Sequence, residues 1–238
     1  MLQLKHSKGF STTETLTVFV IVIIIGALII SGLIHNAQRL ETVSQVKKAY
    51  NTFNKAYNLA KMQEGGPESW ARTKYPVIDY YKVLKKYVRI THMDIPAHLS
   101  GLIYYGIGGD QEIYVSRNEA VLGRLEDGSI IRIANINPRC NSVHGSSTAL
   151  RNVCGELFIQ IRDINGNVTL TNSILGKNTF VFYITTEGFV PVGSKGSKED
   201  AQYMCSKSNN LKTDSRSCTA WALAKENLDY LSRQIKWD

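Results

Sequence analysis

The feature that most constrains this chain is an uncharged apolar stretch near its N-terminus. Residues 16–34 read LTVFVIVIIIGALIISGLI, without a single Asp, Glu, Lys or Arg. A helix rises about 1.5 Å per residue, so about 20 apolar residues cross a hydrocarbon core of about 30 Å. The apolar region of a secretory signal peptide would be shorter and would be followed by a small-residue cleavage site, which is not evident here. The sequence therefore predicts one transmembrane helix over residues 16–34, with a cleaved signal or a buried core helix as the alternatives.

Beyond the apolar stretch, the chain continues as an amphipathic helix to about residue 63. Apolar residues recur at three- or four-residue steps, which is the spacing of one helix face. They are Ala37, Leu40, Val43, Val46, Tyr50, Phe53, Tyr57 and Ala60. The segment Glu64-Gly65-Gly66-Pro67 ends the pattern, because Gly and Pro interrupt helices. We expect this stripe to pack against the chain's own globular head.

From residue 64 onward, short strand-like runs and turns replace the helical pattern. The sequence predicts a helix over 76–90 and strands over 102–105, 113–115, 120–125, 130–133, 157–161 and 180–185. Asp127-Gly128 and Asn165-Gly166 are typical of hairpin turns. The expected fold is α+β, with the long N-terminal membrane helix packed on a mainly antiparallel β-sheet head.

Four cysteines lie in the expected head, at positions 140, 154, 205 and 218. Their spacings match neither a CxxC redox motif nor paired zinc knuckles. An even number of cysteines beyond a membrane anchor favours disulfides in an oxidising compartment, with four reduced thiols as the alternative. Among the three connectivities that four cysteines allow, we expect Cys140–Cys154 and Cys205–Cys218. Each bond would close a loop of about 15 residues and contribute about 3 kcal/mol of stability.

The net charge of +8 is unevenly distributed along the chain. Residues 1–63 contain seven Lys/Arg against two Glu, whereas residues 64–238 contain 21 Lys/Arg against 18 Asp/Glu. The surplus therefore lies mainly beside the apolar stretch, where basic residues meet anionic lipid headgroups. On this distribution, membrane lipid is an expected partner and nucleic acid is not.

A short basic leader precedes the apolar stretch. Lys5 and Lys8 are followed by Gly9-Phe10, and Glu14 stands at the edge of the apolar run. A charged side chain costs about 2.5–3.5 kcal/mol at the centre of a membrane and less near the interface. Glu14 therefore lies either in the headgroup region, where it costs little, or in the membrane beside a partner.

This arrangement resembles the N-terminal signal of type IV prepilins and of type II secretion pseudopilins. The resemblance implies that a prepilin peptidase cuts after Gly9 and methylates the new N-terminus at Phe10. It also implies that Glu14 neutralises the N-terminal amine of a neighbouring subunit during assembly, a pair that a low dielectric strengthens. Many major pilins carry a proline midway along this helix, where the chain has Ser31. The difference favours a minor pilin or a pseudopilin.

The resemblance also implies the organisation and setting of the chain. Residues 1–9 would be a leader peptide, residues 10–63 the N-terminal helix and residues 64–238 the globular head. The implied partners are other pilin or pseudopilin subunits, the prepilin peptidase and the inner-membrane assembly platform. The implied location is the bacterial inner membrane, crossed once, with the head in the periplasm, and then a filament or the cell surface. The implied function is structural, as a subunit of a type IV pilus or type II secretion pseudopilus.

Two other functions remain as alternatives. A DNA-uptake or adhesion pilin would use its head to bind a ligand. A signal-anchored periplasmic enzyme or sensor would need a catalytic constellation, and the sequence has neither an HExxH nor a G-x-S-x-G motif. We therefore expect that the chain is not an enzyme.

No metal or other cofactor is expected from the sequence. The segment at Asp163-Ile-Asn165-Gly166 begins like a calcium loop. The twelfth position of such a loop needs a glutamate, and here it is Ile174. We expect a plain turn at Asp163, with a calcium site as the alternative.

Overall fold

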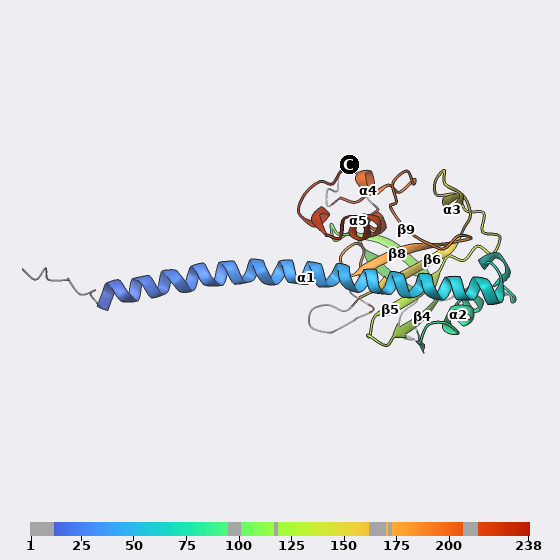
Figure 1. Cartoon of the computed structure of the whole chain (residues 1–238), viewed down its shortest axis with the longest axis horizontal. Helices are drawn as coiled ribbons and strands as arrows, with labels where there is room; N and C mark the ends of the chain where they lie inside the picture. The colour runs from blue at the N-terminus through green and yellow to red at the C-terminus, as the bar shows by residue number, and fades with distance from the viewer. Residues whose placement is uncertain (1–11, 95–100, 117–118, 162–169, 171–172, 207–213) are drawn as a thin grey trace, which may run out of the picture. The chain divides into compact units, whose positions relative to one another are not determined.

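The computed structural model describes residues 12–94, 101–116, 119–161, 170, 173–206 and 214–238, apart from the side chains at positions 14, 26–32 and 35. Helix α1 (Thr12–Glu64) comes first, and a head of short helices and strands follows it (Figure 1). The chain forms two compact units, residues 1–39 and residues 40–238. The second unit begins inside α1, so the C-terminal part of this helix belongs to the same compact body as the head.

The head is built on a six-stranded sheet with the strand order β1-β4-β5-β6-β8-β9. Every neighbouring pair in this sheet is antiparallel, as expected from the sequence. Its strands are β1 (Ile90–Met93), β4 (Ala120–Leu125), β5 (Ile130–Ala134), β6 (Val153–Gln160), β8 (Thr179–Thr185) and β9 (Phe189–Pro191).

The connection between β4 and β5 confirms the hairpin predicted at Asp127-Gly128. Gly128 has a φ of +84°, a left-handed conformation that glycine adopts without a Cβ clash. Its N–H donates to the carbonyl of Leu125 at 2.9 Å, and the N–H of Ser129 donates to the Asp127 carboxylate at 2.9 Å. The turn sets a register in which Arg124 lies opposite Ile130. The second predicted hairpin, at Asn165-Gly166, lies outside the described residues.

Residues 43–60 of α1 pack on one face of the six-stranded sheet. In Figure 1 this part of α1 crosses β5, β6 and β8, while α2 lies beside β4. The buried side chains of α1 in this region are Val43, Val46, Ala49, Phe53, Ala56, Tyr57 and Ala60. The predicted stripe is therefore correct over most of its length, and it is completed by the two alanines at 49 and 56. It is wrong at its start, where Ala37 and Leu40 are both exposed, Leu40 to 64% among the described residues.

The other face of the six-stranded sheet packs against a second, smaller sheet. This sheet has the order β3-β2-β7 and consists of β2 (Gly101–Tyr105), β3 (Gln111–Ser116) and β7 (Ser173–Ile174). Side chains alternate between the two faces of a strand. Along β6, Leu157 and Ile159 join the cluster with α1, whereas Phe158 joins the cluster with the smaller sheet. Every residue of β6 is consequently buried.

Short helices complete the head. They are η1 (Pro67–Ser69), α2 (Pro76–Lys85), α3 (Thr148–Arg151), α4 (Ala201–Met204), η3 (Ser215–Ser217), α5 (Cys218–Lys225) and η4 (Asp229–Leu231). Helix α2 is shorter than the helix predicted over 76–90. The N–H groups of Tyr87 and Val88 both donate to the carbonyl of Leu84, which closes the helix, and Ile90 already begins β1.

Candidate functional site

The residues expected to direct processing and assembly lie at the start of the chain. Gly9 and Phe10 are outside the described residues, and Glu14 lies in α1 with its side chain outside the description. Within the part of the chain that the structure describes, no helix carries an apolar stretch long enough to span a membrane. The span expected over 16–34 includes positions 26–32, whose side chains are not described, and it stays a prediction.

The four cysteines form the two disulfides expected from the sequence. Cys140 is bonded to Cys154, and Cys205 is bonded to Cys218, with sequence separations of 14 and 13 residues. The first bond ties the loop after β5 to β6. The second joins the end of α4 to the first residue of α5. Both bonds lie among buried apolar side chains of the main core.

A partly buried ionic cluster holds the second disulfide segment against the sheet. The Arg216 guanidinium donates to Glu156 on β6 at 2.7 Å and to Asp214 at 2.7 Å. Asn135, at the end of β5, donates to the other carboxylate oxygen of Glu156 at 2.6 Å. Hydrogen bonds to charged groups contribute about 1.5–3 kcal/mol each, so this cluster fixes the position of η3 on the sheet.

The neighbouring residue, Ser215, makes a second connection to the smaller sheet. Its backbone N–H and its hydroxyl donate to the two carboxylate oxygens of Glu112, at 2.8 and 2.6 Å. The same hydroxyl accepts a hydrogen bond from the N–H of Ile107 at 3.1 Å. Burial raises the pKa of the Glu112 carboxyl, while the hydrogen bonds from Ser215 oppose that rise. A serine beside a carboxylate can serve as a nucleophile, but this hydroxyl is fully buried and already holds two partners, so its role is to join the two sheets.

Arg132 is a buried cation in the layer between the two sheets. It lies on β5 and is only 1% exposed, and its guanidinium carbon is 4.2 Å from the ring centre of Tyr104 and 3.7 Å from that of Phe158. None of its guanidinium nitrogens has a hydrogen-bond partner in the described structure. Burial lowers the pKa of this guanidinium, while the nearby Glu156 carboxylate works in the opposite direction. Two aromatic faces therefore take the place of the usual carboxylate partner.

A third polar group gathers around His144. Its Nδ1 lies 3.0 Å from a carboxylate oxygen of Glu199, and its ring centre is 4.3 Å from that of Tyr183 on β8. The Tyr183 hydroxyl, the other Glu199 oxygen and the Ser197 hydroxyl are all buried without a hydrogen-bond partner among the described residues. The contact holds the segment before α4 against β8 of the six-stranded sheet.

The His144–Glu199 contact gives the head an acid-sensitive element. Burial opposes ionisation of Glu199, but the hydrogen bond and charge of His144 outweigh it and hold the pKa of this carboxyl below its usual range. A carboxyl whose pKa is lowered by folding contributes stability above its unfolded pKa and loses that contribution as the pH falls through its folded pKa. Below a pH of about 4.5, we therefore expect the urea midpoint to fall more steeply in the wild type than in Glu199→Gln.

Tryptophan fluorescence during urea unfolding, repeated across this pH range, measures the difference. The matched control is Glu187→Gln, which removes an exposed carboxylate without an ion pair in the described structure. The control should follow the wild-type pH profile. Parallel profiles for Glu199→Gln and the wild type would contradict the assignment.

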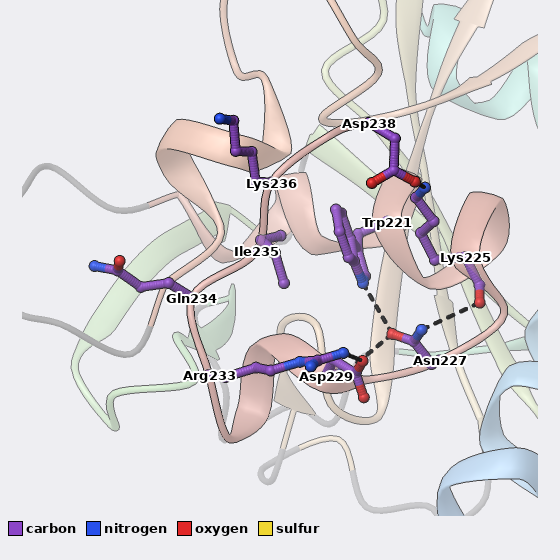
Figure 2. A pocket seen from close by; sticks show the side chains of 9 residues that line it. All are labelled: Trp221, Lys225, Asn227, Asp229, Arg233, Gln234, Ile235, Lys236 and Asp238. Carbon is purple, nitrogen blue, oxygen red and sulfur yellow. Dashed lines mark hydrogen bonds and ion pairs between the residues drawn. The ribbon is translucent and has the colours of Figure 1, made fainter.

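A polar pocket of about 280 Å³ lies at the C-terminal end of the head. Figure 2 shows Trp221 at its centre with Ile235 beside the ring, while Gln234 and Lys236 point away. Asn227 accepts a hydrogen bond from Trp221 Nε1 at 2.9 Å and donates to the carbonyl of Lys225 at 3.2 Å. The remaining charged lining residues form the ion pairs Lys225–Asp238 and Arg233–Asp229.

These bonds fix the pocket's polar groups to one another. Trp221 is 6% exposed, so most of its ring is covered by the protein and packs near Trp237, with ring centres 5.0 Å apart. The contacts among the lining residues therefore hold the C-terminal segment against α5. None of the side chains that line the pocket pairs a nucleophile with a base.

The described residues contain no group of three or more His, Cys, Asp or Glu side chains positioned to hold a metal ion. The calcium alternative at Asp163 lies outside the described residues. Sequence analysis missed the buried ionic residues Arg132 and Glu156 and the partly buried Arg216. A sequence signal for Arg132 was present, because this residue interrupts the apolar run Ile-Ile-Arg-Ile of a strand that is buried on both faces.

The chain matches no protein-family model, no curated protein and no solved structure.

Proposed function

We propose that this chain is a structural subunit, a minor pilin or a pseudopilin, of a type IV pilus or of a type II secretion pseudopilus. In this proposal, a prepilin peptidase cuts the chain after Gly9, and the mature subunit assembles through its N-terminal helix. The chain is then a building block of a filament and not an enzyme. Before assembly it lies in the bacterial inner membrane, with its head in the periplasm.

The observation that carries the proposal is the packing of the C-terminal part of α1 against the sheet of the head. Residues 43–60 supply one side of the main core, and polar contacts reinforce it. The Tyr57 hydroxyl donates to the carbonyl of Thr185 at 2.9 Å, and the Lys61 ammonium donates to the carbonyl of Thr186 at 2.8 Å. A subunit that polymerises through its N-terminal helix needs the C-terminal part of that helix fixed to its own head.

The membrane part of the proposal rests on the sequence of residues 16–34 and on the leader before it. An uncharged apolar run preceded by Gly9-Phe10 and Glu14 matches the spacing of prepilin signals. The two disulfides support a compartment outside the cytosol, because disulfides persist in oxidising environments and are rare in the cytosol.

Intact mass and N-terminal sequencing test the proposal directly. The chain is expressed with its cognate peptidase and extracted from membranes, and we expect a mature protein that begins at N-methylated Phe10. A Gly9→Leu variant is expected to keep its original N-terminus. A wild-type chain that still begins at Met1 in the presence of the peptidase would overturn the proposal.

Assembly is tested with the two acidic residues of the N-terminal helix before residue 64, Glu14 and Glu41. Glu14→Ala is expected to be processed but excluded from filaments, because the N-terminal amine of a neighbouring subunit loses its partner. Glu41→Ala removes an exposed carboxylate from the same helix and is expected to be incorporated normally. Equal incorporation of both variants would contradict the role proposed for Glu14.

A further inference from the structure

Arg132 on β5 carries a charge that no carboxylate of the described structure neutralises directly. Its side chain is 1% exposed, and none of its guanidinium nitrogens has a hydrogen-bond partner among the described residues. An arginine stays protonated in proteins and presents several N–H donors in a fixed fork. Buried charges are normally paired, because it is costly to take an unpaired charge out of water. The position of this residue therefore needs an explanation beyond packing.

The two aromatic rings beside Arg132 attract its charge but do not satisfy its N–H groups. The guanidinium carbon lies 4.2 Å from the ring centre of Tyr104 and 3.7 Å from that of Phe158. Contacts of this kind stabilise a cation through the π electrons of the ring. The N–H groups lie in the plane of the guanidinium, where a carboxylate is the acceptor that fits them best. Arg132 therefore keeps its donors available for a carboxylate.

The register of the six-stranded sheet places such a carboxylate within reach. Glu156 on β6 lies two residues before Phe158, which is the residue opposite Arg132. Arg132 and Glu156 are therefore diagonal neighbours on the same face of the sheet. Diagonal neighbours are about 7–8 Å apart, a separation that long side chains can span. Burial lowers the pKa of the Arg132 guanidinium, while Tyr104 and the Glu156 carboxylate oppose that shift.

In the described structure, Glu156 is committed to a different arginine. One of its carboxylate oxygens accepts a hydrogen bond from Arg216 at 2.7 Å, and the other accepts one from Asn135 at 2.6 Å. Glu156 is only 6% exposed. If Arg216 moved away, Glu156 would have to find another cation or remain as a buried charge without one. Arg132 is positioned to be that cation.

Arg216 does not depend on Glu156 for its own partner. Its Nε and Nη2 donate to the carboxylate oxygens of Asp214, at 2.9 and 2.7 Å. Asp214 and Arg216 belong to one short segment that includes η3, so this pair can move with η3 as a neutral unit. Glu156 and Arg132 would then form a second neutral pair on the sheet. All four charges are partnered after such a separation.

We infer that Arg132 is a reserve partner for Glu156, which exchanges Arg216 for Arg132 when η3 leaves the sheet. The exchange lowers the cost of releasing η3, because it leaves no buried carboxylate alone. The hydrogen bonds of Ser215 to Glu112 still favour the docked position of η3. This inference does not depend on the proposed filament function, because it concerns contacts within one head.

A double-mutant cycle on the full chain in a neutral detergent tests the exchange. Urea unfolding, followed by tryptophan fluorescence, is measured for Arg132→Met, for Arg216→Met and for the variant with both changes. Arg132→Met alone is expected to change the unfolding equilibrium constant by less than about tenfold, because it removes a cation that has no acceptor. Arg216→Met alone is expected to raise that constant by less than about a hundredfold, because Glu156 turns to Arg132. The variant with both changes leaves Glu156 without a cation, and its effect should exceed the product of the two single effects at least about tenfold.

The matched control replaces Arg132→Met with Arg124→Met, a change at an exposed arginine on the neighbouring strand β4. In combination with Arg216→Met, its effect should equal the product of the single effects. Adding Glu156→Gln to the variant that lacks Arg132 and Arg216 should lower the unfolding equilibrium constant at least about tenfold, because a neutral amide needs no cation. If the variant without both arginines does not fold, Glu156→Gln should restore a cooperative transition. Single effects that multiply without excess, or no recovery with Glu156→Gln, would overturn the inference.

Hydrogen exchange of the Ser215 N–H, measured by NMR on the full chain, tests the release of η3. This N–H donates to Glu112 at 2.8 Å and exchanges with solvent when that bond opens. Arg132→Met removes the reserve partner and should slow this exchange at least about tenfold, while Arg124→Met should leave the rate unchanged. Equal exchange rates in the wild type and in Arg132→Met would show that η3 is not released by the proposed exchange of partners.

Discussion

Replacing Phe53 with alanine is expected to lower the free energy of unfolding of the head by about 3–5 kcal/mol. Phe53 is fully buried on the inner side of α1, and its ring lies edge-on to Phe189 with 5.9 Å between ring centres. The substitution removes this packing and leaves a cavity between the helix and the sheet. Alanine improves helix propensity by less than about 0.7 kcal/mol, which offsets only a small part of the loss.

Urea unfolding followed by tryptophan fluorescence measures this effect, because Trp70, Trp221 and Trp237 all lie in the head. Trp70 is especially suited to report this effect. Its ring centre is 5.7 Å from that of Tyr57, which lies one helical turn after Phe53 on α1. The matched control is Leu59→Ala, which shortens an apolar side chain on the outer side of the same helix, where it is 46% exposed.

The control is expected to change the free energy of unfolding by less than about 1 kcal/mol, because partly exposed side chains lose little packing. A loss below about 1.5 kcal/mol for Phe53→Ala would mean that α1 is not seated in the head as described. A large loss for both variants would instead point to a general weakening of the helix.

The side of α1 that packs on the head could be predicted from the sequence because the spacing of apolar residues along a helix is a local pattern. A repeat of three or four residues fixes which side of a helix is apolar, and Val46, Phe53 and Tyr57 follow that repeat. The exposed end at Leu40 could not be predicted, because the repeat does not say where the head stops covering the helix. That boundary depends on the sheet, whose residues lie 50 or more positions further along the chain.

The strands predicted over 120–125 and 130–133 match β4 and β5 closely because a short turn pairs them locally. The edge strands β1 and β9 were missed. Their four and three residues are too short to show an alternating pattern, and their partners are distant in sequence. The order β1-β4-β5-β6-β8-β9 is likewise a result of tertiary packing, which no local pattern encodes.

The disulfides could be predicted from local sequence spacing, whereas the contacts of the charged residues could not. Sequential pairing of four cysteines in two close pairs was a natural expectation from spacing, and both bonds are present. The contact between Arg216 and Glu156 joins residues 60 positions apart, and nothing in either local sequence identifies the partner. The contact of Arg132 with the rings of both Tyr104 and Phe158 also requires two sheets to meet.

Removing the bond between Cys205 and Cys218, by changing both residues to alanine, is expected to lower the free energy of unfolding by about 3 kcal/mol. The bond closes a loop with a sequence separation of 13, and its loss enlarges the ensemble of the unfolded chain. It also frees the start of α5, where the Thr219 hydroxyl accepts a hydrogen bond from the N–H of Val181 on β8 at 2.9 Å. Urea unfolding under non-reducing conditions measures the change.

The matched comparison is the Cys140→Ala, Cys154→Ala double variant, which opens a loop of nearly the same length. If the unfolded chain carries the effect, both double variants should lose about the same free energy, and both should show a larger dependence of stability on urea because the open chain exposes more surface. If contacts in the folded head carry it, the variant at 205 and 218 should lose more, because its bond also fixes the start of a helix whose Trp221 and Ala222 are buried in the main core. A loss below about 1 kcal/mol in both would contradict a stabilising role for the disulfides.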